Sequence, residues 1–384
     1  MSAPRVYLDW NATTPPRTEV LDAMRDVAGR AWANPASTHT DGRAARAVVE
    51  DARAAIGALY ATDPRDVVFT SGGTEANNLA IRSAFAAPPS SDPPWLLTSR
   101  LEHPSVTRVA EALEKEGRAR LRWIGILPSG TIDLADLERA LAELAAILVT
   151  VQAVNHETGI VQPVADVIGL ARAKKARVHV DAVQAWGKVA VPQGADTASL
   201  GAHKMRGPKG IGALFTRPGA RLVPLLVGGA QEKGIRPGTV DPALAAGAGV
   251  AARCVDIARF DGVRARRDAL EKELLALNEG GAAPRVAGDV SKRAPHVSTT
   301  LWPGWVSAEL VAALDLEGVS VSAGSACSAG TIEPSPVIGA MLGQDVASCA
   351  VRASFGETTT DEDVRAAVAA FRRVLSRTPR ARRS

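Results

Sequence analysis

The most informative chemical groups in the sequence are an aspartate and a lysine that each follow a short apolar run. Asp181 and Gln184 end the segment HVDAVQ, and Lys204 lies in GAHKMRGPKGIG, directly after His203 and before a Gly/Pro-rich turn. Taken singly, the carboxylate is compatible with a helix cap and the amine with a solvated loop charge. Together at one sheet edge they fit a site for pyridoxal phosphate (PLP). This cofactor requires a lysine that binds it covalently and a carboxylate that keeps its pyridine nitrogen protonated.

A glycine-rich turn offers a site for the phosphate of that cofactor. The segment FTSGGTEANNLAI runs from a strand pattern through Gly72, Gly73 and Thr74 into a helical pattern. Free backbone N–H groups and the helix dipole would face an anion there, and the Thr74 hydroxyl would add a bond. The same residues are compatible with an ordinary turn in which Thr74 caps the helix. Nucleotide binding is disfavoured, because the turn has neither a Walker lysine nor the G-x-G-x-x-G pattern.

Two further polar residues follow predicted strands. His103, in RLEHPSV, has a flat imidazole that can stack on a cofactor ring and move protons near neutral pH, although a lone histidine is also typical of a cap. Asn155, in VQAVNHETGIVQP, can donate to a phenolic oxygen, and we expect its neighbour His156 to make no direct contact. The histidines show no H-E-x-x-H spacing, so no metal site is expected.

The three cysteines are too few and too scattered for a disulfide framework. Cys254 and Cys349 are interpreted as small buried residues. Cys327 differs, because it stands in VSAGSACSAGTIEPS among glycines, serines and alanines that would leave a thiol accessible on a segment with conformational freedom. It is therefore the candidate reactive thiol.

The elements that must position these groups follow an alternating pattern. Short apolar runs at 66–70, 95–99, 121–126, 147–152, 177–182, 197–201 and 210–216 predict strands. Helical patterns separate several of them, including one at 133–144 that Asp133 would cap. Strands that alternate with helices indicate an α/β fold with a largely parallel sheet covered on both faces.

The second half of the chain changes character. A long alanine-rich helical region is predicted over 242–278, followed by a Gly/Pro-rich connector. Strand and helix patterns beyond it predict a smaller α+β domain. We therefore expect a large domain over 15–255 and a small domain formed by 1–14 and 256–384.

Composition limits the classes of protein that remain. The chain has 384 residues, 46% of them hydrophobic, and its net charge of +4 arises from 45 basic and 41 acidic residues that are interleaved. Such interleaving does not indicate nucleic-acid binding. No apolar run reaches the roughly 18 residues of a membrane span, and the first ten residues do not resemble a signal peptide. We expect a cytoplasmic enzyme with no membrane contact.

The whole sequence resembles the cysteine desulfurases, a group of class-V aminotransferase-like, fold-type I PLP enzymes. The matching segments are, in order, YLDWNATTP, NPAST, FTSGGTEANNLAI, EHPSV, VNHETGIVQP, HVDAVQAWGK, AHKMRGPKGIGAL, GGAQEKGIRPGT, SAGSACSAGTIEPS and VRASFGETTT. The resemblance implies a mostly parallel seven-stranded central sheet, PLP as cofactor and L-cysteine as substrate.

The resemblance also implies roles around the cofactor ring. Lys204 would bind PLP covalently, Asp181 would pair with the pyridine nitrogen, and His103 would stack on the ring. Gln184 and Asn155 would bind the phenolic oxygen, and Asn155 would also contact the substrate.

Further implied roles concern the phosphate and the substrate. Gly73, Thr74 and His203 would contact the phosphate, and Thr239 would reach the phosphate of the other subunit of a homodimer. Arg352 would bind the substrate carboxylate, a task suited to a planar two-pronged cation.

By the same resemblance, Cys327 would attack the sulfur of L-cysteine, leaving alanine and a persulfide on Cys327. The persulfide would then pass to a sulfur-acceptor protein, for instance in iron–sulfur cluster assembly or tRNA thiolation. One departure from the family pattern is Gly201, which stands where a serine hydroxyl usually helps to bind phosphate. Ser199 or water would then substitute for it.

Alternatives remain open from the sequence. A selenocysteine lyase, an aminotransferase or an epimerase would share the fold, and a scaffold without activity would share the surface. Cys327 argues against an aminotransferase. The joint presence of all five candidate residues argues against a scaffold; they are Lys204, Asp181, His103, Arg352 and Cys327.

Overall fold

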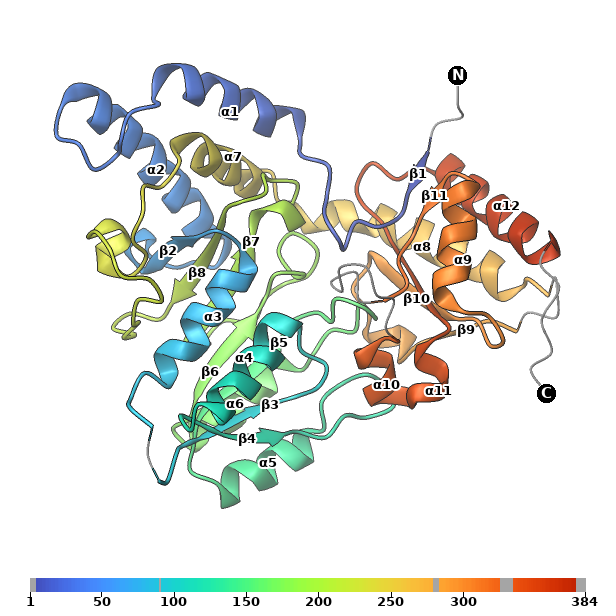
Figure 1. The fold of residues 1–384 in the computed structure, drawn as a ribbon. Helices are drawn as coiled ribbons and strands as arrows, with labels where there is room; N and C mark the ends of the chain where they lie inside the picture. Colours follow the sequence, from blue (N-terminus) through green and yellow to red (C-terminus); the bar gives the residue numbers. More distant parts are fainter. Residues whose placement is uncertain (1–4, 90, 279–282, 325–333, 378–384) are drawn as a thin grey trace.

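A computed structural model describes residues 5–89, 91–278, 283–324 and 334–377. Its central feature is a seven-stranded sheet with the strand order β2-β8-β7-β6-β5-β3-β4 (Figure 1). The strands are β2 Val67–Thr70, β3 Trp95–Thr98, β4 Arg120–Trp123, β5 Ala146–Gln152, β6 Arg177–Asp181, β7 Thr197–Gly201 and β8 Gly212–Thr216. All seven predicted strands are confirmed and belong to this one sheet.

The sheet is mostly parallel. Strands β4, β3, β5, β6 and β7 pair in parallel, whereas β8 pairs antiparallel with both β7 and β2. The last five residues of β5 are buried, as expected of a strand with both faces covered. Parallel pairing brings the carboxyl ends of β3, β5, β6 and β7 to one edge, which is where open α/β sheets bind ligands.

Helices pack on this sheet and beside it. The helices of this part of the chain are α1 Thr18–Arg30, α2 Thr40–Leu59, α3 Gly73–Ala84, α4 Pro104–Lys115, α5 Leu134–Glu143, α6 Val164–Ala173 and α7 Pro242–Arg253. Helix α3 contacts β6, β7 and β8, and α6 contacts β5 and β6. The predicted cap is confirmed, because the Asp133 carboxylate accepts hydrogen bonds from the backbone of Ala135 and Asp136.

The single helical region predicted over 242–278 was wrong in one respect. It consists of α7 and α8 (Phe260–Leu275), and a short 3₁₀ turn (Ile257–Arg259) separates them. Asp256 causes the break, because its extended backbone and its side chain, which accepts from Ala258 N, begin a new turn. Cys254 therefore ends α7 and is only partly buried, whereas Cys349 is buried as expected.

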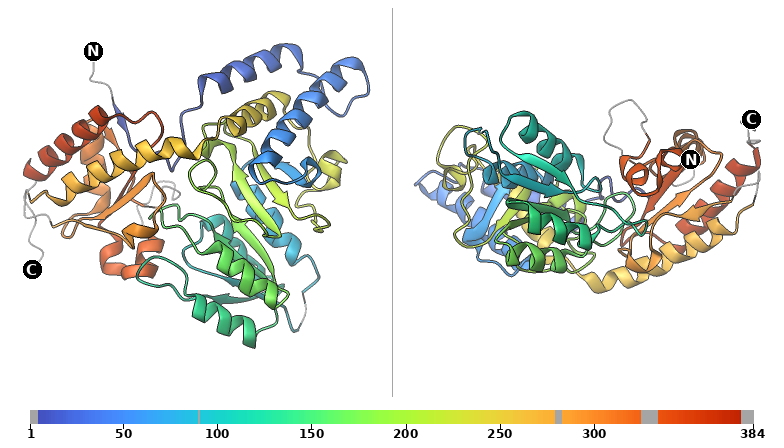
Figure 2. Two further views of the ribbon diagram at one scale, coloured as in Figure 1. Left: turned by 180° about the vertical axis from the view of Figure 1, so that it is seen from behind. Right: turned by 90° about the horizontal axis from the view of Figure 1, so that it is seen from below.

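The C-terminal part of the chain, together with the N-terminal strand, forms a second layer of structure beside the large sheet. It contains a three-stranded sheet in the order β12-β10-β9 and a parallel pair, β1 with β11. These strands are β1 Val6–Tyr7, β9 Arg285–Val286, β10 Val297–Leu301, β11 Val319–Ser320 and β12 Ala350–Ser354. The helices are α9 Ser307–Leu316, α10 Pro336–Leu342, α11 Gln344–Ala347 and α12 Asp361–Arg377. Figure 2 shows α8 running across the small sheet from behind.

Two large apolar clusters correspond to these two layers. One lies around the seven-stranded sheet and includes residues such as Phe69 and Val180. The other combines Val6 and Leu8 with Phe260, Trp302 and residues of α12. The N-terminal strand thus packs with the C-terminal part of the chain. The boundaries at 14/15 and 255/256 stay predictions.

Candidate active site

A pocket of about 360 Å³ lies where the carboxyl ends of the central strands face the small sheet. The residues that line it are Asn11, Ala12, Gly73, Thr74, Asn77, His103, Pro104, Ser105, Gln152, Val154, His156, Asp181, Val183, Gln184, His203, Lys204, Gly324 and Arg352. Most of the residues predicted from the sequence therefore meet in one cavity, and both halves of the chain contribute to its wall.

Lys204 reaches this pocket from the turn directly after β7. The turn Ala202–Lys204 is a single 3₁₀ turn that β7 leads into. The Lys204 amine donates to two main-chain carbonyls, Asn11 O at 2.5 Å and Ala12 O at 2.9 Å. The N-terminal segment therefore holds the end of the lysine side chain at a fixed place in the pocket.

Asp181 is the last residue of β6, and its side chain is only 7% exposed. Asn77 Nδ2 donates to Oδ2 at 2.8 Å, and Val183 N and Ser199 Oγ donate to Oδ1 at 3.1 and 3.3 Å. Ser199 thus serves the carboxylate, so its hydroxyl is engaged away from the predicted phosphate site. These donors fix the direction in which the carboxylate faces the pocket.

Neighbouring groups of Asp181 are electrically neutral at pH 7. Burial lowers the pKa of His179 to about 4, although the charge of Asp181 opposes the shift. Burial, followed by the negative charge of Asp181, raises the pKa of Glu102 to about 8. His179 Nε2 bonds to Asn77 Oδ1 at 2.9 Å, so a neutral histidine orients the asparagine that donates to Asp181.

The predicted phosphate cradle lies at the start of α3. The first main-chain bond of this helix runs from Ala76 N to Gly72 O, so the amides of Gly73, Thr74 and Glu75 have no acceptor within the helix. A Cβ on Gly73 would lie 2.4 Å from Val183 Cγ2, so any larger residue there would force Val183 to move. His203 lies nearby, with Nδ1 bonded to Thr13 Oγ1 at 3.1 Å, and burial lowers its pKa to about 4. The cradle offers neutral donors to an anion.

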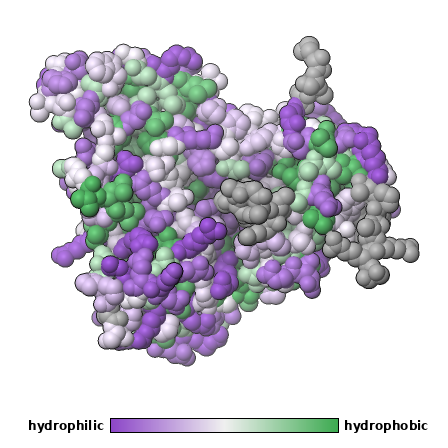
Figure 3. Space-filling view, in the orientation of Figure 1, coloured by the Kyte–Doolittle hydropathy of each residue, from purple (hydrophilic) through white to green (hydrophobic). Residues whose placement is uncertain are grey.

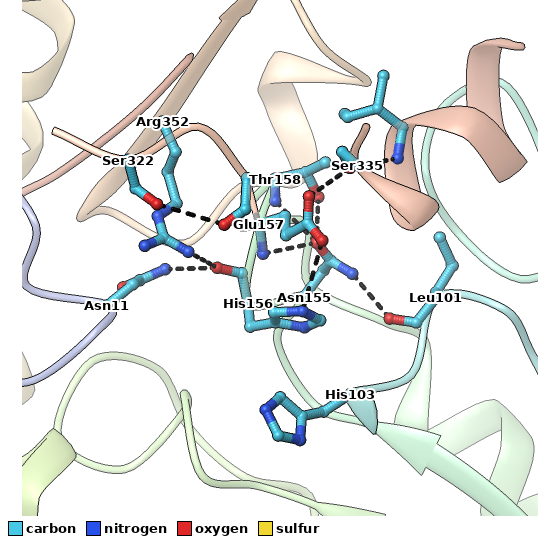
Figure 4. A network of polar contacts seen from close by, with 12 residues as sticks. Asn11, Leu101, His103, Asn155, His156, Glu157, Thr158, Ser322, Ser335 and Arg352 are labelled. Atoms are coloured by element: carbon cyan, nitrogen blue, oxygen red, sulfur yellow. Dashed lines mark hydrogen bonds and ion pairs between the residues drawn. The ribbon is translucent and has the colours of Figure 1, made fainter. Parts of the chain in front are cut away.

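His103 is both the cap of α4 and a wall of the pocket. Ser105 N donates to His103 Nδ1 at 3.1 Å, so Nε2 carries the proton of the neutral ring. Burial lowers the pKa of His103, and the charges of Asp181 and Lys204 act on it in opposite directions. The ring lies edge-on to His156 at 5.2 Å between centroids (Figure 4).

Asn155, which the sequence predicts to contact the cofactor and the substrate, does not line the pocket in this structure, and the predicted contact stays a prediction. Asn155 is fully buried, its Nδ2 donates to Leu101 O, and its Oδ1 accepts from Glu157 N, Thr158 N and Thr158 Oγ1 (Figure 4). The side chain therefore closes its own turn instead of facing the pocket. His156, which we expected to make no direct contact, lines the pocket in its place, and its buried Nδ1 has no partner among the described residues.

Arg352, on β12, presents a constrained guanidinium to the pocket. Its Nη2 pairs with Asp9 at 2.7 Å, and its Nη1 donates to His156 O at 2.9 Å. Asn11 Nδ2 donates to the same carbonyl at 3.0 Å, and Asn11 Oδ1 and Arg352 Nε are buried without a described partner (Figure 4). Polar atoms without partners around one cavity are typical of a binding site that awaits a polar ligand.

Two predicted residues are not placed in the pocket. Thr239 lies in an exposed loop before α7, outside the pocket lining of this chain. Cys327 lies outside the described residues. Gly324, three positions earlier in the sequence, is part of the pocket wall.

Sequence reasoning missed Asn11, Asn77, Ser105 and His156. Asn11 and Asn77 stand inside segments that carry the family resemblance, YLDWNATTP and FTSGGTEANNLAI, so the signal was present. Asn77 was missed because it lies one helical turn beyond the glycines, where its side chain shares a face with Gly73.

The residues present fit PLP. An amine and a carboxylate that approach the cavity from adjacent strands match the covalent bond and the ring nitrogen, and the free amides of α3 match the phosphate. No group of three or more His, Cys, Asp or Glu side chains that could hold a metal ion occurs among the described residues. Within the same residues, no helix is long and apolar enough to cross a membrane.

Residues 6–367 match the family model for aminotransferase class-V, and the chain belongs to this family. Within it, the chain is a member of the PLP-dependent cysteine desulfurases. It is 40% identical over 365 residues to a cysteine desulfurase of Cereibacter sphaeroides, covering 94% of this chain and 93% of the relative. It is 36% identical to the mitochondrial cysteine desulfurase of Saccharomyces cerevisiae, with 94% and 72% of the two chains covered.

Solved structures agree with this assignment. A NifS-like protein superposes with a TM-score of 0.89 at 28% identity, covering 97% of this chain and all of the other. The structure described as SspA in complex with cysteine has a TM-score of 0.80 at 29% identity, covering 92% and 99%. The predicted fold class and family are thereby confirmed.

Proposed function

We propose that the protein takes sulfur from L-cysteine, releases L-alanine and carries the sulfur as a persulfide on Cys327. The observation that carries this proposal is the meeting of Lys204, Asp181 and Arg352 in one pocket whose wall continues to Gly324. An amine, a ring-nitrogen partner and a carboxylate receptor are the groups that a PLP enzyme acting on an amino acid requires.

The described residues would hold PLP as follows. Lys204 would bond to the cofactor, Asp181 would pair with the pyridine nitrogen, and His103 would cover one face of the ring. Gln184 would donate to the phenolic oxygen. The first-turn amides of α3, with Gly73, Thr74 and His203, would bind the phosphate. His156 lines the same pocket, and the contact of Asn155 with the cofactor stays a prediction.

PLP, when bound, supplies an electron sink for the bonds at the substrate α-carbon. Arg352 binds the α-carboxylate, and Asp9 together with His156 O keeps its guanidinium in place. The Lys204 amine would hold and move a proton at the substrate α-carbon, and Asn11 O and Ala12 O would keep this amine nearby. The Cys327 thiolate receives the substrate sulfur, and the carbon left behind takes up a proton to give alanine.

We further propose a homodimer in which Thr239 of one chain reaches the phosphate site of the other. Thr239 lies outside the pocket of its own chain, so a role at the phosphate requires a second copy. Leu225, Leu226 and Val227 are exposed on the loop after β8, and Figure 3 shows apolar surface gathered on that side of the molecule. Exposed apolar side chains in one segment are typical of a contact surface.

The remaining parts of the proposal concern the domain boundaries, the sulfur acceptor and the location of the protein. We propose that residues 15–255 form the PLP-binding domain and that 1–14 with 256–384 form the smaller one, with the two apolar clusters as support. The persulfide would pass to a sulfur-acceptor protein of iron–sulfur cluster assembly or tRNA thiolation. We propose the cytoplasm as location, since three cysteines suit a reducing compartment.

The test supplies the holoenzyme with L-cysteine and a reductant and measures both alanine and sulfide. Wild type should release the two in equal amounts, and Lys204→Ala should release neither. Cys327→Ser should lose both products, whereas the control variant Cys254→Ser, at the end of α7, should keep them. Sulfide release that persists in Cys327→Ser would exclude the persulfide role.

A further inference from the structure

Lys188 is a buried lysine that the proposed mechanism does not use. It lies in the turn after β6, four residues beyond Gln184, and is only 5% exposed. Its Nζ donates to Gln184 Oε1 at 3.2 Å, and it forms no ion pair with a carboxylate of the described residues. Ammonium groups are costly to bury without a compensating charge, so this arrangement requires a physical reason.

The contact to Gln184 determines which way its amide faces. Because Oε1 accepts from Lys188, the two N–H bonds of Nε2 must point elsewhere. One of them reaches Asn11 O at 3.0 Å, the same carbonyl that holds the Lys204 amine. Gln184 lines the pocket and is itself buried, so its second N–H bond is left to point toward the pocket.

Lys188 itself does not line this pocket. It lies on the wall of a second, much smaller cavity that shares Lys204 with the first, together with Arg17, Arg206 and Glu357. Glu357 already pairs with both arginines, so it offers no separate counter-charge to Lys188. Burial, followed by the positive charge of Lys204, lowers the pKa of Lys188 to about 7.

We propose that Lys188 is a positioning residue that orients the Gln184 amide, so that Nε2 donates to the phenolic oxygen of PLP. Bound PLP would bring negative charge to the pocket that Gln184 lines, and this charge would offset part of the cost of burying Lys188. The inference rests on the proposed contact between Gln184 and the cofactor. It assigns to Lys188 no contact with the cofactor or the substrate.

The first experiment separates positioning from structure. Lys188→Met keeps the length of the side chain and removes the buried ammonium group, which offsets the loss of the donor to Gln184 Oε1, so the melting temperature of the apoprotein should change little. The dissociation constant for PLP, followed by quenching of tryptophan fluorescence, should rise by about tenfold, the size of one lost oriented hydrogen bond. The control variant Lys174→Met, which removes an exposed lysine at the end of α6, should change neither quantity.

The second experiment asks whether Lys188 acts through Gln184. On a Gln184→Leu background, Lys188→Met should cause no further loss of PLP affinity, because there is no amide left to orient. Equal losses on both backgrounds, or unchanged affinity in the single variant, would overturn the inference. A wild-type protein that fails to bind PLP at all would instead overturn the proposed cofactor site itself.

Discussion

Gly201 offers a sharp test of how the phosphate is held. It is buried as the last residue of β7, and a Cβ added to it would lie 3.5 Å from Gly73 N and 3.6 Å from both His203 Cδ2 and Val183 Cγ1. These are ordinary van der Waals distances, so serine fits at this position. We expect Gly201→Ser to place a hydroxyl beside the phosphate cradle, where the sequence pattern of the family usually has one.

The magnitude follows from the charge of the acceptor. A hydrogen bond to a charged group contributes about 1.5–3 kcal/mol, or roughly 10- to 150-fold in a dissociation constant. PLP release from Gly201→Ser, followed by cofactor absorbance after addition of a PLP scavenger, should therefore be at least about tenfold slower than from wild type. Gly201→Ala is the matched control, since it adds the same Cβ without the hydroxyl.

The apoproteins should show the opposite order. Without the phosphate, the buried hydroxyl of Gly201→Ser lacks its intended acceptor, so the apo form of this variant should melt below that of Gly201→Ala. Equal rates of PLP release from the serine and alanine variants would refute the idea that a hydroxyl is missing from the cradle.

Two further predictions concern individual side chains. Asn155→Ala removes four buried hydrogen bonds, so urea unfolding should show a destabilisation of about 2–4 kcal/mol. His156→Ala should leave stability nearly unchanged and weaken PLP binding. The reverse pattern would indicate that Asn155, and not His156, contacts the cofactor. The pKa of His179 falls from 6.5 in the unfolded chain to about 4 in the folded protein. Between these pH values the unfolded chain binds more protons than the folded protein, so the free energy of unfolding decreases as the pH falls from 6.5 to 4. In His179→Gln the decline in melting temperature from pH 6.5 to pH 4.5 should be smaller than in wild type, and an unchanged decline would contradict this assignment.

The sequence was sufficient for those parts of the structure that depend on local pattern. Each apolar run became a strand of the large sheet, and the residues after β3, β6 and β7 reached one pocket because parallel strands align their carboxyl ends. Asp181, Lys204 and His103 could be predicted for this reason. The family resemblance supplied Arg352, whose strand belongs to another sheet.

The features that sequence patterns did not predict have an equally physical origin. Asn155 and His156 are adjacent in a turn, and only the three-dimensional path of the turn decides which side chain closes it and which enters the pocket. The break between α7 and α8 depends on Asp256, a residue that helical periodicity does not exclude. Lys188 has the composition of an ordinary surface lysine, and only burial reveals its contact with Gln184.

The parallel pairing of β1 with β11 has a mechanical consequence. Asn11, which holds the Lys204 amine, follows β1 by four residues, and Gly324 follows β11 by four residues. Both exits are tied to β12, since Asn11 N donates to Ser354 Oγ and Ser322 exchanges two main-chain bonds with Arg352. Any tilt of this short ribbon therefore displaces the lysine's acceptor, the Arg352 guanidinium and Gly324 together.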